Sequence, residues 1–208
     1  MGGRGASFGR ANPAPLDAFR NAKTIIFDDE LKGMNMVLVN KTLKGVQDTL
    51  KEFGLPLSVV KSVGASMNAN AATSANGLGQ LGLGRNVYSS SANEFPNDDY
   101  FIDSTAYGNG THEAGHLITN YLMRKHNSSL STLQQAKLRS SGKWDRDILK
   151  QAKKINGGSL SAISKYGSNS KGKAASEIVA EAVSEYMKKG KAASASSKAI
   201  VQVLKSYL

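Results

Sequence analysis

The stretch THEAGHLITNYLMRK, residues 111–125, decides how the rest of the chain is interpreted. Its apolar residues recur at helical spacing: Leu117, Ile118, Tyr121 and Leu122. Asn109 or Thr111 can cap the start of such a helix. On it, His112 and His116 lie one turn apart on the same face. We therefore expect a helix that presents two imidazoles side by side.

The two histidines belong to an HExxH pattern with Glu113 between them. Imidazoles at this spacing can bind one zinc ion, and Glu113 can take a proton from a water that the metal activates. Two ordinary capping or core histidines are the alternative. Ala114 and Gly115 favour the metal site, because small residues let the helix pack closely. The chain has only one other histidine and no cysteine, which leaves histidine and carboxylate as the main candidate ligands.

Catalytic zinc usually has three protein ligands, so a third residue is expected elsewhere in the chain. An extended HExxHxxGxxH pattern is excluded because Leu122 occupies its last histidine position. His126 lies near the expected helix end, where a solvated side chain is typical. Asp145 and Asp147 lie at a polar helix start, where a carboxylate faces the helix dipole.

Stronger candidates for the third ligand lie in SEIVAEAVSEY, residues 176–186. Glu177, Glu181 and Glu185 follow one another at intervals of four and line one stripe of a helix, where like charges repel. They are the only acidic residues after Asp147, in a basic region. One interpretation is a solvated acidic face. We favour the alternative that one carboxylate binds the metal and another holds a ligand histidine.

The remaining pattern predicts an α+β fold, with a small mixed or antiparallel sheet in the first half and a mainly helical second half. Strands are expected at 25–27, 57–63 and 85–89, and helices at 34–53, 130–139, 145–155, 159–165, 174–189 and 196–207. Residues 64–93 are rich in glycine and predict a hairpin or loop. Their GxGxxG match at 77–82 lacks a βαβ frame, so we do not interpret it as a dinucleotide site.

Charge is divided unevenly along the chain. The net charge is +11, but residues 1–120 carry 10 basic against 11 acidic residues, and residues 121–208 carry 17 against 5. A basic region suggests a nucleic-acid partner. The aromatic residues there form no stacking series and no nucleic-acid motif is present, so nucleic acid is a less favoured partner.

The HEAGH motif with a downstream acidic helix resembles the gluzincin zinc metallopeptidases. The sequence is more similar to the catalytic domain of anthrax toxin lethal factor and its relatives, many of them encoded by phages and prophages. Those relatives have a Tyr-Gly in a loop, followed by a helix of the form E-aromatic-aromatic-A-E-A. This chain has Tyr166-Gly167 and then EIVAEAV at 177–183. This chain differs from the family pattern in two ways. Ile178 and Val179 stand where the family has aromatic residues, and the loop between Tyr166 and Glu177 is longer.

The resemblance implies a zincin-like fold with one Zn²⁺ per chain, Glu177 as the third ligand and Glu113 as the general base. Glu181 would be a carboxylate that touches a ligand histidine or the substrate, and Tyr166 would stabilise the oxyanion. A second register is similar to the thermolysin-like E-A-x-S-D segment and makes Glu181 the ligand. We favour Glu177 because only that register pairs with the upstream Tyr-Gly of the lethal-factor-like pattern.

These observations predict a zinc metalloendopeptidase, phage- or prophage-encoded, that hydrolyses protein or peptide substrates, phage head or virion proteins among them. The alternative is a basic nucleic-acid- or capsid-associated binding or structural protein with an inactive peptidase-like fold. We expect a flexible Gly/Arg-rich linker or tail at 1–14 and one peptidase domain at 15–208, with an α/β part to 110 and a helical part from 111. Without an apolar span or signal segment, we expect no membrane partner and a cytoplasmic or virion-associated protein, including delivery as cargo.

Overall fold

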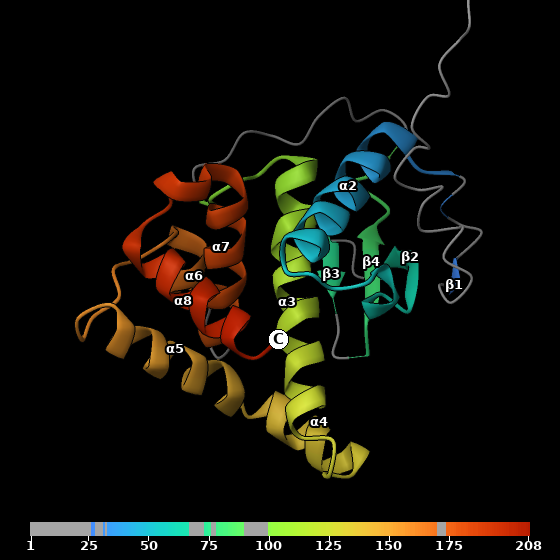
Figure 1. The fold of residues 1–208 in the computed structure, drawn as a ribbon. Coiled ribbons are helices and arrows are strands. Elements are labelled where there is room, and N and C mark those ends of the chain that lie inside the picture. Colours follow the sequence, from blue (N-terminus) through green and yellow to red (C-terminus); the bar gives the residue numbers. More distant parts are fainter. Residues whose placement is uncertain are drawn as a thin grey trace, which may run out of the picture.

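The computed structural model describes residues 26–27, 31, 33–66, 73–75, 78–89, 100–169 and 174–208, so the expected linker at 1–14 lies outside the described residues. The fold is mixed α+β and mostly helical. A long central helix, α3 (Ala106–His126), has helix α2 (Met36–Glu52) and the sheet on one side (Figure 1). On its other side lie α7 (Ala174–Lys189) and α8 (Ala195–Ser206).

The sheet contains β1 (Ile26–Phe27), β2 (Ser62–Ser66), β3 (Thr73–Ala75) and β4 (Gln80–Gly84), in the spatial order β1-β2-β4-β3. β1–β2 and β2–β4 are parallel pairs, and β3–β4 is antiparallel. The expectation of a mixed sheet is therefore confirmed, and that of an antiparallel sheet is wrong. The physical reason is that α2 forms the crossover between β1 and β2, which is the connection that parallel strands require.

The glycine-rich region forms a hairpin from β3 and β4, as predicted. Gly79 enters β4 with φ +84°, and a Cβ atom there would lie 2.5 Å from the carbonyl oxygen of Val59. Glycine alone fits this close approach. The expected strand at 85–89 is wrong, because Val87 and Tyr88 both donate their backbone N–H to the Gly84 oxygen and close a turn directly after β4.

The first helix confirms its prediction. Asn35 caps α2 by accepting a hydrogen bond from the Val37 N–H at 3.0 Å, and Gly54 follows the helix with φ +63°. Residues 57–63 do not form one strand as expected. Their first part is a 3₁₀ turn (Leu57–Val59), in which the Val60 N–H donates to the Leu57 oxygen, and β2 begins at Ser62.

The second half is helical, as predicted, through α4 (Thr132–Ser140), α5 (Lys143–Ile155), α6 (Lys165–Asn169), α7, a 3₁₀ turn (Gly190–Ala192) and α8. The expected helix at 159–165 is wrong. Ser161 donates its N–H to Ser196 Oγ on α8 at 2.9 Å, a tertiary bond that replaces helical pairing. None of the described helices combines the length and the apolar character needed to cross a membrane.

Helix α3 begins five residues before the expected start, so the division at 110/111 falls inside it. Thr105 is the cap and accepts the Gly108 N–H at 3.0 Å. The helix then crosses α2 at close range. A Cβ on Gly110 would lie 2.0 Å from the Thr42 oxygen, and one on Gly45 would lie 2.2 Å from the Tyr107 oxygen. These two glycines set the distance between α2 and α3.

Replacing Gly110 by alanine should therefore destabilise the protein by about 2 to 3 kcal/mol, because backbone must move to admit the methyl group. Helix propensity acts in the opposite direction, by about 1 kcal/mol. Urea unfolding followed by circular dichroism measures the change. Gly33→Ala is the control, since a Cβ at Gly33 meets no atom within 4 Å. Equal stability of the two variants would contradict the close crossing.

Candidate metal centre

Helices α3 and α7 bring two histidines and one carboxylate together. Glu177 Oε2 lies 3.2 Å from His112 Nε2 and 3.4 Å from His116 Nε2. The potential ligand atoms of the three residues lie within 4.8 Å of one another. His112 and His116 are partly exposed and Glu177 is buried. This group can hold a metal ion.

The environment of Glu177 supports that interpretation. Its Oε2 atom is buried and has no hydrogen-bond partner, although both imidazoles face it. Burial acts to raise the pKa of Glu177, but the two histidines hold it well below its usual range. A buried carboxylate oxygen without a hydrogen bond normally requires a compensating partner. Two imidazole nitrogens and one carboxylate are a ligand set that zinc accepts.

Glu181, one turn further along α7, holds His112 from the other side. Its Oε1 lies 2.7 Å from His112 Nδ1, and its Oε2 accepts the Ile102 N–H at 3.0 Å. Burial lowers the pKa of His112, but the neighbouring carboxylates Glu177 and Glu181 outweigh it and raise the pKa to about 10. A carboxylate on Nδ1 directs Nε2 toward the metal position. Glu177 therefore lies against the Nε2 atoms of both histidines, whereas Glu181 lies on the Nδ1 side of His112.

The small residues of the HEAGH segment explain how α7 comes so close. Ala114 is fully buried, and a Cβ on Gly115 would lie 2.9 Å from Ala180 Cα on α7. Beside this contact, the Thr111 and Ser184 hydroxyl oxygens are 2.9 Å apart. A larger residue at 115 would push away the helix that carries Glu177.

Tyr166 reaches the group in spite of the longer loop after it. Its ring packs on Phe101 with centroids 4.6 Å apart and lies edge-on to His112 at 5.8 Å. Burial and the charges of Glu177 and Glu113 raise the pKa of Tyr166 to about 12. Glu113 is buried on α3 beside the histidine pair. The structure thus places Tyr166 beside His112, and Glu113 on the same helix as the two histidines.

Asp145, which the sequence analysis considered only as a carboxylate at a helix start, lies within electrostatic reach of the metal centre. It is buried in the first turn of α5, and burial raises its pKa, while the charge of His116 acts in the opposite direction. A carboxylate is common at a helix start, so nothing in the sequence pointed to a place for Asp145 near His116, and no motif spacing joins the two residues. His126 lies elsewhere: its Nε2 is 2.8 Å from the Tyr207 oxygen and its ring stacks on Trp144.

Glu185, the third acidic residue of the stripe, has a structural role. It accepts hydrogen bonds from Ser194 and Ser197, at the start of α8, and from Lys189. Burial acts to raise the pKa of Glu185, but these three donors lower it to about 2. The carboxylate thus joins α7 to the N-terminus of α8.

Glu185→Gln should lower the free energy of unfolding by about 2 kcal/mol at pH 7, because charged hydrogen bonds are lost. The ordinary pKa is 4.5 and the folded value is about 2, so this stabilisation is present above pH 4.5 and is lost as the pH falls toward 2. Urea unfolding of wild type and variant between pH 7 and pH 3 measures the difference. Glu52→Gln is the control, since Glu52 forms an exposed pair with Lys205. A pH-independent difference would contradict this role.

Comparisons of the chain with protein-family models, with curated proteins and with solved structures found no match. The assignment of this site therefore depends on its own geometry.

The geometry makes a direct prediction about metal binding. Glu177→Ala should abolish binding of one Zn²⁺ per chain, because it removes a ligand. Glu181→Ala should keep the ion and weaken its binding by about 10- to 100-fold, because only the support of His112 is lost. Equilibrium dialysis with Zn²⁺ and elemental analysis measures both. The reverse order of effects would make Glu181 the ligand.

Proposed function

We propose that this chain is a zinc-dependent metallopeptidase of the gluzincin type, in which His112, His116 and Glu177 hold one zinc ion. The observation that carries the proposal is the buried Glu177 Oε2 atom, which faces both Nε2 atoms and has no hydrogen-bond partner. The resemblance to the lethal factor catalytic domain and its phage-encoded relatives agrees with this set of residues. It also underlies our proposal of a protein or peptide substrate.

Zinc bound by these residues would lower the pKa of water and polarise a peptide carbonyl. Glu113 then takes the proton of the attacking water and delivers it to the leaving amine. Its place between the two histidine positions on α3 supports this role. Glu181 keeps His112 oriented through the 2.7 Å contact with Nδ1.

The Tyr166 hydroxyl donates a hydrogen bond to the oxyanion that forms on the substrate carbonyl. One donor of this kind is worth about 3 kcal/mol in the transition state. The raised pKa of Tyr166 keeps its proton in place at neutral pH. β3 is one of the two edge strands of the described sheet and is the one that packs against α3, so we propose that an extended substrate pairs with it.

Glu113→Gln should abolish peptide cleavage while the zinc content stays near one per chain, because glutamine cannot accept the proton. Mass spectrometry of a peptide library, together with elemental analysis, measures both quantities.

Tyr166→Phe should reduce kcat/KM by about 100-fold, with zinc retained, because it removes one oxyanion donor.

Full activity of Glu113→Gln would overturn the mechanism. If kcat/KM is unchanged in Tyr166→Phe, Tyr166 has no part in the mechanism, but the proposed metal site is not contradicted.

The rival function is a basic nucleic-acid- or capsid-associated binding protein, favoured by the 17 basic against 5 acidic residues of 121–208. Tight DNA binding that weakens steeply with salt, in a protein that binds no zinc, would establish it. A cytoplasmic or virion-associated location belongs to the metallopeptidase proposal and rests on the resemblance to phage-encoded proteins.

A further inference from the structure

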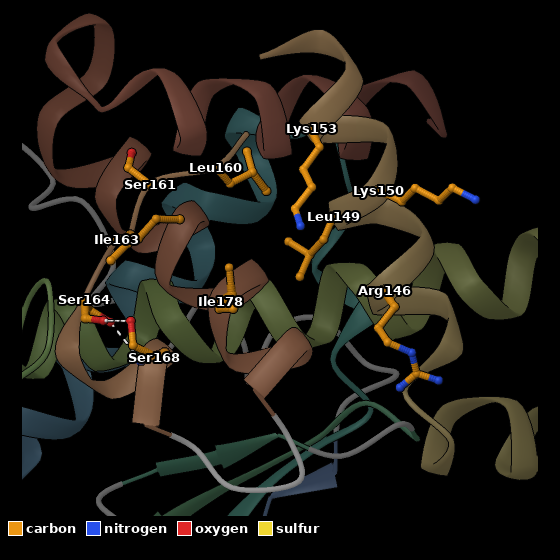
Figure 2. Close-up of a pocket in the computed structure, with 12 residues that line it drawn as sticks. Arg146, Leu149, Lys150, Lys153, Leu160, Ser161, Ile163, Ser164, Ser168 and Ile178 are labelled. Carbon is orange, nitrogen blue, oxygen red and sulfur yellow. Dashed lines mark hydrogen bonds between the residues drawn. The ribbon is translucent and has the colours of Figure 1, made fainter. Parts of the chain in front are cut away.

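A cavity of about 550 Å³ lies between α5, the segment 160–168 and α7. Figure 2 shows its two sides, with Arg146, Lys150 and Lys153 on α5 and with Ile163, Ser164 and Ser168 opposite them. The volume falls in the range of sites that bind small molecules or parts of a peptide.

The lining combines an apolar surface with positive charge. Leu149, Leu160, Ile163 and Ile178 supply the aliphatic surface. Lys153 turns beside Leu149 toward the cavity, while Lys150 and Arg146 extend outward from the same helix (Figure 2). None of the described residues that line the cavity is acidic.

The cavity is lined by residues that neighbour the metal centre along the chain. Two of its lining residues, Gly167 and Ile178, directly follow Tyr166 and Glu177 in the sequence.

A second hollow of about 370 Å³ shares Ile163 and Ser164 with the cavity and extends to Phe101 and Ile102. Phe101 packs on Tyr166, and the Ile102 N–H binds Glu181. The two hollows thus lead from α5 to the residues around His112.

We propose that this cavity binds a peptide segment in which an apolar side chain is flanked by acidic residues, and that it selects such segments as substrates. The apolar side chain packs on the aliphatic lining, one carboxylate meets Lys153 inside the cavity, and the other meets Lys150 at its outer edge. Among the described residues, no carboxylate lies within 4 Å of either ammonium group, so both are available for an anionic partner. The substrate role rests on the proposed peptidase function, whereas peptide binding can be tested without it.

The lining favours a peptide over a nucleic acid. Single-stranded nucleic acids are held by aromatic side chains on which the bases stack. No aromatic residue is among the described residues that line the larger cavity. Aliphatic surface beside lysines suits a leucine-like side chain next to a carboxylate.

Fluorescence anisotropy tests binding with the full chain carrying Glu113→Gln, so that no probe is cleaved. The probes are fluorescein-labelled hexapeptides with a leucine between glutamates, a leucine between lysines, or a serine between glutamates. The first should bind at least about tenfold more tightly than the others. Adding K150E and K153E should weaken it by about tenfold, because attraction becomes repulsion.

The charge-matched control is K137E with K198E, whose lysines are exposed on α4 and α8 and do not line the cavity. This control should change the affinity less than twofold. Equal weakening by both pairs, or equal binding of the three probes, would overturn the proposal. So would an oligonucleotide of equal charge that binds more tightly through Lys150 and Lys153.

Cleavage of a peptide library separates this inference from the proposed function. In wild type, bonds in segments with a leucine flanked by glutamates should be preferred, and K150E with K153E should remove the preference with zinc content unchanged. If cleavage occurs without that preference, the substrate role of the cavity is wrong and the peptidase stands. If wild type cleaves no peptide, the peptidase proposal fails, and the anisotropy result still decides peptide binding.

Discussion

The close approach of α3 and α7 at Gly115 is the contact on which the metal centre depends. A Cβ there would lie 2.9 Å from Ala180 Cα, so the two backbones meet with almost no side chain between them. The same helix approaches α2 through Gly110, which holds α3 in place from the other side. A helix confined on both sides keeps His112 and His116 at a constant distance from Glu177, and a metal site needs that constancy.

The acidic stripe of α7 shows how one helix can carry three different tasks. Glu177 faces the two imidazoles, Glu181 holds His112, and Glu185 accepts hydrogen bonds from the start of α8. Like charges at this spacing would repel on an isolated helix. Here Glu177 faces the two imidazoles, Glu181 and Glu185 have hydrogen-bonding partners, and the pKa of each carboxylate is lowered. The local repulsion is therefore offset by tertiary contacts.

The sequence predictions succeeded where the pattern was local. The helices expected at 34–53 and 174–189 are found at Met36–Glu52 and Ala174–Lys189, where apolar residues recur at helical spacing. They failed where a distant residue decided the outcome. The segment 159–165 does not form the expected helix, and within it the Ser161 N–H bonds to Ser196, which is 35 residues away. The strand expected at 85–89 failed for a local reason, because the Gly84 oxygen is shared by two turn hydrogen bonds.

The sequence by itself determined that two imidazoles share one helical face and that three carboxylates share another, because a helix sets the direction of neighbouring side chains. Only the tertiary structure decided that Glu177 faces both Nε2 atoms while Glu181 lies behind His112, since both glutamates belong to the same stripe. It also placed Tyr166 beside His112 and formed the lysine-edged cavity between α5 and α7. Spacing along a helix determines orientation, whereas the distance between segments far apart in the chain is set by how closely the helices pack.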